Sequence, residues 1–155
     1  MALNAGVLIP PFISTFRKLN VSPEIAAAEF VQGIDSYVRL SMNVAFGNFL
    51  SWAPPISQVI TIFRTPNVSP EIFATELTTA IESGLSSIYT LFQITLTVPY
   101  GLMLGDMIRI ARTPNVAPDI MALDLAAAID KECRSITVSA SDPKLLGAPI
   151  VGPLF

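Results

Sequence analysis

The sequence predicts a mainly α-helical domain built from three internal repeats of a helix-turn-helix hairpin, each about 47–48 residues long. The first observation is the repeat itself: Arg64–Ile72 returns almost unchanged as Arg112–Ile120, and a looser copy stands at Arg17–Ile25. The second is a helix-start signal inside every copy, and the third is an amphipathic pattern that follows it. Self-similarity at a fixed period is typical of a repeated structural unit, so this pattern outweighs any local signal.

Each copy opens with a short predicted helix and a turn. Apolar residues at spacings of three and four precede a repeated arginine, which suits the negative end of the helix dipole. A repeated asparagine follows in the turn, where its side chain can bond its own backbone. A proline and a carboxylate then begin the long helix. These structural repeat positions are Arg17, Arg64, Arg112, Asn20, Asn67, Asn115, Pro23, Pro70, Pro118, Glu24, Glu71 and Asp119.

The start of the long helix carries a capping signal in the first two copies. Serine, proline and glutamate occupy residues 22–24 and 69–71. Serine accepts a hydrogen bond from a free amide, proline has no amide to satisfy, and the carboxylate favours the positive end of the helix dipole. In the third copy Ala117 replaces the serine, so we expect that helix to start about 1 kcal/mol more weakly.

An apolar stripe runs along each long helix. In the middle copy its residues recur at spacings of four and three, which places them on one face, and the other copies keep the same positions. Cys133 lies on the stripe and is therefore predicted to be a small buried apolar side chain rather than a reactive thiol. The stripe includes Phe73, Leu77, Ile81, Leu85 and Ile88, with Phe30, Ile34, Leu125 and Ile129 among the counterparts.

One domain over residues 1–141 is predicted to hold the three hairpins, at about 8–46, 55–98 and 103–140, in pseudo-three-fold or short-solenoid order. We expect the long helix of the middle copy to reach about residue 92. Alternating residues at Gln93–Val98 and Ser135–Ala140 predict short extended links, with a less regular third at Leu40–Val44.

Residues 142–155 are predicted to form a coil C-terminal arm, because three prolines and two glycines interrupt them. Their apolar side chains suggest that the arm packs on a neighbouring subunit. Together with the single tryptophan, they form the candidate interface. Its residues are Trp52, Leu145, Leu146, Ile150, Val151, Leu154 and Phe155.

Composition limits the classes of function. Charged residues make up 14% of the chain, against about 25% in an average domain, and a surface so poor in charge is prone to associate. A net charge of −3, with no basic cluster beyond Arg17 and Lys18, argues against nucleic-acid binding. The N-terminus lacks the positive segment of a secretory signal.

Catalytic constellations are absent from the sequence. Without histidine the chain lacks the commonest general base and metal ligand, and one cysteine excludes an intrachain disulfide. No phosphate-loop, dinucleotide-binding or zinc-protease motif occurs. We therefore expect no enzymatic activity, no cofactor and no metal site.

Nine of the twelve carboxylates recur at three repeated positions. The first and third positions lie about 20° apart on the helix, opposite the apolar stripe, which predicts a solvated face. Two alternatives remain: a three-fold set of acids that holds a cation, or ion pairs with the repeated arginines, which otherwise cap their own helices. The nine are Glu24, Glu71, Asp119, Glu29, Glu76, Asp124, Asp35, Glu82 and Asp130.

The leading functional expectation is a structural, self-assembling subunit of a virion, such as a minor capsid or cement protein, or of a cytoplasmic assembly. Its partners would be copies of itself or other assembly subunits. The alternative is a membrane-associated protein that uses the uncharged segments 40–63 and 83–105, although both contain prolines and polar residues. A third hypothesis is an apolar small-molecule binding module. The repeated motif does not indicate a known family.

Overall fold

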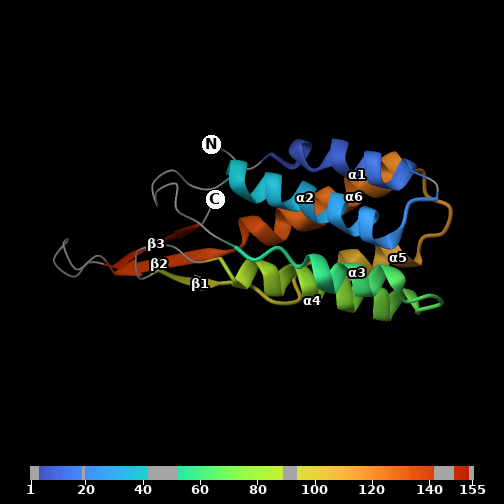
Figure 1. Ribbon diagram of the computed structural model, residues 1–155. Helices are drawn as coiled ribbons and strands as arrows, with labels where there is room; N and C mark the ends of the chain where they lie inside the picture. Colours follow the sequence, from blue (N-terminus) through green and yellow to red (C-terminus); the bar gives the residue numbers. More distant parts are fainter. Residues whose placement is uncertain (1–3, 19, 42–51, 89–93, 142–148, 154–155) are drawn as a thin grey trace.

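The computed structural model describes residues 4–18, 20–41, 52–88, 94–141 and 149–153. The predicted class is confirmed at its coarse level, since the described chain is mainly helical (Figure 1). A 3-10 turn at Ala5–Val7 leads into pairs of one short and one long helix. The helices are α1 Ile9–Arg17, α2 Pro23–Ser41, α3 Ile56–Arg64, α4 Pro70–Ser86, α5 Leu104–Arg112 and α6 Pro118–Arg134.

Asparagine makes the turn within each pair. Asn20, Asn67 and Asn115 have φ values of 67°, 59° and 57°, in the left-handed region. Asparagine enters this region more readily than most residues because its short polar side chain can hydrogen-bond locally. The short helix can therefore end at arginine and the long helix can begin at proline only a few residues later.

The long helices start as the capping signals predict. The Ser69 hydroxyl accepts a hydrogen bond from the Ile72 amide at 3.3 Å, and the Ser22 hydroxyl accepts one from the Ile25 amide at 3.4 Å. Ala117 provides no side-chain cap for α6.

The helices close on themselves. Besides the contacts within each pair, α2 packs on α3, α4 packs on α5, and α6 returns to pack on α1. The predicted apolar stripe forms the core between them: Ile34, Ile81 and Ile129 are completely or almost completely buried, and so is Cys133. Each long helix thus contacts helices on two sides rather than one.

A three-stranded antiparallel sheet lies at one end of the helices, away from the turns within the pairs (Figure 1). We call this the sheet end, and the opposite end the turn end. Its strands are β1 Ile94–Thr97, β2 Thr137–Ser141 and β3 Pro149–Pro153, in the order β1-β2-β3. β1 falls inside the predicted extended segment Gln93–Val98, and β2 overlaps the predicted segment Ser135–Ala140 and extends one residue beyond it.

The prediction that the C-terminal arm is coil is wrong for Pro149–Pro153. This segment forms β3 and pairs with β2 of its own chain, Pro149 opposite Ser141 and Pro153 opposite Thr137. An edge strand tolerates proline because only one side of it needs to donate hydrogen bonds, and both prolines stand at strand ends. The rest of the arm, including Leu145, Leu146, Leu154 and Phe155, lies outside the described residues.

The predicted end of the middle long helix is also wrong, because α4 stops at Ser86 rather than near residue 92. Ser87 is its C-cap. The Ser87 hydroxyl donates to the Gly84 carbonyl at 2.6 Å and accepts from the Ala53 amide at 2.8 Å. This serine joins the helix end to another segment, which a periodic apolar pattern cannot reveal.

Candidate functional site

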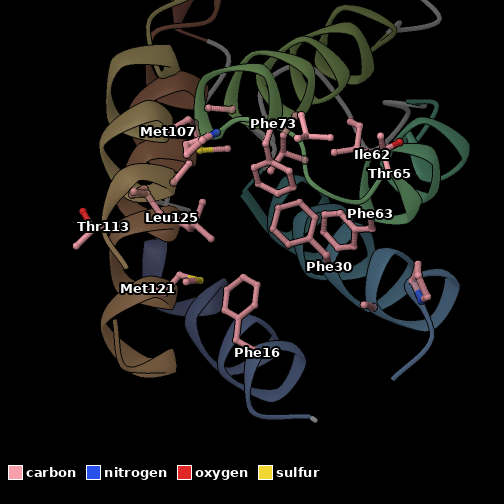
Figure 2. Close-up of a pocket in the computed structure, with 18 of the residues that line it drawn as sticks. Phe16, Phe30, Ile62, Phe63, Thr65, Phe73, Met107, Thr113, Met121 and Leu125 are labelled. Carbon is pink, nitrogen blue, oxygen red and sulfur yellow. The ribbon is translucent and has the colours of Figure 1, made fainter. Parts of the chain in front are cut away.

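An apolar cavity of about 620 Å³ opens among the helices at the turn end (Figure 2). All six helices and the turns between them contribute to its lining. Phe30, Phe63 and Phe73 gather on one side, while Met107 and Leu125 face them from α5 and α6. The cavity therefore lies where the three helix pairs meet.

Aromatic rings form one wall of the cavity. Phe30 contacts Phe63 with ring centroids 6.0 Å apart, and Phe63 stacks near Phe73 at 6.2 Å. Behind this wall, the buried Phe12 stacks on Phe30 at 4.9 Å. Such offset and tilted arrangements suit the ring quadrupoles. The opposite wall contains methionines, whose flexible thioethers adapt to irregular shapes. One side is therefore aromatic and the other contains flexible side chains.

At two positions of the cavity lining, a small residue stands where the repeated sequence elsewhere has a large one. In the sequence, Ala111 directly precedes Arg112, as Phe16 precedes Arg17 and Phe63 precedes Arg64. Likewise, Ala26 of α2 stands where the other long helices have Phe73 and Met121. All of these residues line the cavity, so two small residues leave open a volume that large side chains would fill.

Few polar side chains line the cavity, and none of the lining residues in the described chain is charged. The Thr65 hydroxyl donates to the Thr61 carbonyl at 2.9 Å, and the Thr113 hydroxyl donates to the Arg109 carbonyl at 2.8 Å. Thr65, Asn67 and Thr113 all belong to the turns, which places the polar groups at the rim. The geometry suits an uncharged molecule with an apolar body.

The repeated arginines form ion pairs that join successive helix pairs. Arg112 Nε lies 2.6 Å from Glu71 Oε1, and Arg17 Nη2 lies 2.7 Å from Asp119 Oδ2, which connects α1 to α6. Arg64 pairs in the same way with Glu24. The structure therefore contains the bridge to an adjacent long helix that was one of the open alternatives.

These ion pairs are well exposed, so they contribute more to the register of the helices than to stability. Glu24 begins a helix, and its own backbone amide together with Arg64 lowers its pKa to about 2. The carboxylate thus stays charged and the pair stays intact over the physiological pH range. Surface pairs of this kind weaken as salt is added.

The solvated face predicted for the third acidic position is wrong. The Trp52 indole donates to Asp35 at 2.6 Å, the Tyr37 hydroxyl donates to Asp130 at 2.5 Å, and Glu82 is only 4% exposed. The donor to Glu82 is the Gly101 amide. In all three cases the donor comes from a neighbouring helix pair or the loop that leads into it, because the long helices pack on both sides. A single-helix projection cannot show this second contact face.

The acids do not gather around one cation. The three acids at the second repeated position have different surroundings. Glu29 pairs with Lys18, Asp124 pairs with Arg109, and Glu76 lies on the exposed face of α4. No group of three or more acidic or cysteine side chains that could hold a metal ion occurs within the described ranges. Glu132 is completely buried but belongs to none of the repeated acidic positions, so the repeat pattern provides no signal for it.

Trp52, which the sequence suggested as a core or an interface residue, is part of the buried core. It is 5% exposed and packs over Gly84, where an added Cβ would lie 3.1 Å from the indole ring and 2.9 Å from Pro55. Ile150 and Val151, also predicted at the interface, belong to β3. The core accepts the tryptophan because glycine leaves room for its ring.

Comparison with known proteins finds no matching family, no similar curated protein and no similar solved structure. Of the helices in the described chain, none combines the length and apolar character needed to cross a membrane. The uncharged segment 83–105 is divided among the end of α4, β1 and the start of α5. Segment 40–63 likewise includes the end of α2 and most of α3.

Proposed function

We propose that the three helix pairs are equivalent copies of one unit, arranged as a closed pseudo-three-fold ring. Three features support this: the repeated left-handed asparagines, the repeated start of the long helix at proline, and the cyclic ion pairs. Since α6 packs on α1, a closed ring fits better than a solenoid with free ends.

On this basis, the function that the geometry supports best is the binding of an uncharged apolar small molecule in the cavity. The observation that carries this proposal is a space of about 620 Å³ lined by phenylalanine and methionine from all three pairs. Ligand pockets have volumes of roughly 300–1,000 Å³ and are mostly apolar, with a few polar groups. This activity is binding without chemistry, in keeping with the expectation that the chain is not an enzyme.

A ligand would resolve a packing problem. Native cores contain few voids larger than a water molecule, and Phe16, Phe63, Phe73 and Met121 remain only partly buried around this one. Burying a large apolar side chain contributes about 1.5–3 kcal/mol. An apolar ligand would remove these side chains from water, while any polar group on it would stay at the rim near Thr65 or Thr113.

The test uses N-phenyl-1-naphthylamine, an uncharged fluorescent probe with an apolar body. The protein should bind it in a one-to-one complex, with the emission increase typical of an apolar environment. Ala111→Phe places in α5 the residue that α1 and α3 already carry. It should weaken binding by about tenfold or more, a loss of about 1.4 kcal/mol or greater, because the ring fills the cavity.

The matched control is Ala127→Phe, an equal change on the exposed side of α6. It should bind the probe like the original protein, and circular dichroism should show equal helical content in both variants. The proposal fails if the original protein does not bind the probe, or if Ala111→Phe folds and binds it equally well.

Self-assembly is a second candidate, favoured by one observation. The isoleucine that ends each repeated motif is equally exposed in all three copies: Ile25 by 53%, Ile72 by 52% and Ile120 by 54%. On a charge-poor surface, three such side chains at equivalent positions could contact other subunits, including copies of this chain. No contact among these residues bears on a location in a virion or at a membrane, so both locations stay predictions.

Sedimentation velocity tests this second candidate. The original protein should form oligomers whose population grows with concentration, and the triple variant Ile25→Ser, Ile72→Ser, Ile120→Ser should be monomeric. Ile56→Ser is the control, because Ile56 is exposed but lies outside the repeated motif. A monomer at every concentration for the original protein would eliminate self-assembly.

A further inference from the structure

The junction between α4 and the third helix pair contains two buried carboxyl groups. At the other two junctions the repeated acid meets a neutral donor: Asp35 meets Trp52, and Asp130 meets Tyr37. At this junction Glu82 is joined by Glu132, which occupies the position that Tyr37 and Gly84 hold in the other long helices. This junction therefore differs from the others in its chemistry.

Both carboxyl groups hold the same loop. Glu82 Oε1 accepts a hydrogen bond from the Gly101 amide at 2.6 Å, and Glu132 Oε2 accepts one from the Met103 amide at 3.1 Å. Gly101 and Met103 belong to the segment 99–103, which leads from β1 into α5. Two acids from α4 and α6 thus fasten one loop to the helical core.

Glu132 is the more unusual of the two. Its side chain is 0% exposed, and its second oxygen, Oε1, is buried without a hydrogen-bond partner among the described residues. A buried polar atom without a partner costs free energy, and a buried charge costs much more. The site therefore favours a state in which Glu132 carries a proton.

The charged groups nearby do not neutralise the pair. Lys131 is the nearest cation in sequence, but its Nζ pairs with Asp106 of α5 at 3.0 Å. On the same helix, Asp130 pairs with Arg134 and accepts from Tyr37 of α2, and Cys133 is a buried thiol. From the loop, the Tyr100 hydroxyl contacts the Ser86 hydroxyl of α4. No ion pair within the described chain joins Glu82 or Glu132 to a cation.

A divalent metal ion is a poorer fit than a proton. Calcium takes six to eight oxygen ligands and magnesium about six, whereas this site presents two carboxyl groups whose other neighbours are amide donors. A single proton satisfies the chemistry with no further ligand, because it removes one charge and the repulsion between the acids.

We propose that Glu82 and Glu132 form a buried proton-binding site that fastens the loop 99–103 to α4 and α6 when protonated and releases it when the proton leaves. Neither Glu82 nor Glu132 nor any residue of the loop 99–103 lines the cavity, so the site requires no ligand there. Burial and the neighbouring Glu82 raise the pKa of Glu132 to about 7, and burial raises the pKa of Glu82. The Met103 and Gly101 amides oppose these shifts, because an N–H donor favours the charged carboxylate, but burial outweighs them.

The direction of the pH effect follows from linkage. In the unfolded chain Glu132 loses its proton near the ordinary pKa of 4.5, while the folded chain keeps it until about 7. Between these values the folded state binds more protons, so stability falls as pH rises. One proton corresponds to a change of up to about tenfold in the unfolding constant per pH unit. Above about pH 7 the folded chain has also lost this proton, so Glu132 causes no further change in stability with pH.

The test measures urea unfolding of the full chain from pH 5 to pH 8. The original protein should lose stability as pH rises, and Glu132→Gln should remove up to about tenfold per pH unit of that dependence. Glu76→Gln, on the exposed side of the neighbouring helix α4, should keep the original slope. Hydrogen exchange should show the Gly101 and Met103 amides losing protection with rising pH only where Glu132 is present.

If Glu132→Gln does not fold, Glu82→Gln provides the second variant. Removing the neighbouring charge lowers the pKa of Glu132, so the stability loss should move to lower pH. A flat profile for the original protein over this range would overturn the proposal. An unchanged slope in Glu132→Gln, or an unchanged window in Glu82→Gln, would do so as well.

Discussion

Single residues explain how the chain changes direction at the turn end. Asn20, Asn67 and Asn115 lie in the turns, as the sequence predicted, and the structure places all three in the left-handed conformation. The preference is local, since it depends on a side chain bonding nearby backbone, so sequence alone could reveal it. The burial of Trp52 and Glu132 was not predictable in this way, because each depends on residues from another helix pair.

The helix caps provide a prediction at this scale. Ala117→Ser should stabilise the protein by about 1 kcal/mol, because the new hydroxyl can accept a hydrogen bond from a free amide at the start of α6. Ser69→Ala should destabilise it by about the same amount by removing the hydrogen bond from the Ile72 amide. Urea denaturation at pH 6 measures both. Equal stability of all three proteins would show that these caps contribute nothing.

At the scale of secondary-structure elements, the starts of the long helices were predictable and some ends were not. Proline and an acidic residue mark each start by local chemistry. The end of α4 depends on Ser87, whose hydroxyl also accepts from the distant Ala53 amide. Similarly, β3 forms in a proline-containing segment because β2 offers it an edge.

The two contact faces of the long helices belong to the same scale. The apolar stripe predicted the buried face correctly, and Ile81 and Leu85 are completely buried. The polar side was predicted as solvated, yet it contains Glu82, which accepts a hydrogen bond from Gly101. A helix enclosed between two neighbours can bury polar groups as long as they find donors there.

At the scale of the whole molecule, we expect the contact of α6 with α1 to influence how the chain unfolds. In an open helical array each unit contacts only its neighbours, so cooperativity can break down. In a closed ring every helix pair has two neighbours, so unfolding of one pair exposes the apolar faces of the two pairs that pack on it. We therefore expect one cooperative transition for the whole helical part.

Urea unfolding followed by two probes measures this cooperativity. The fluorescence of Trp52 reports on the contact between the first two helix pairs, while far-ultraviolet circular dichroism reports on all the helices. The two transitions should coincide, as they do for a two-state domain. A tryptophan transition that clearly precedes the loss of helix would contradict the closed ring.

The sequence by itself determined the mainly helical class, the positions of the turns and the helix starts, because these follow from local chemistry and periodicity. It also located the apolar stripe that becomes the core. Only the tertiary structure decided that α6 meets α1, that Ala26 and Ala111 leave a cavity, and that Glu82 and Glu132 share a buried junction. Each of these features depends on side chains far apart in the chain, and their contacts exist only after the helix pairs have packed.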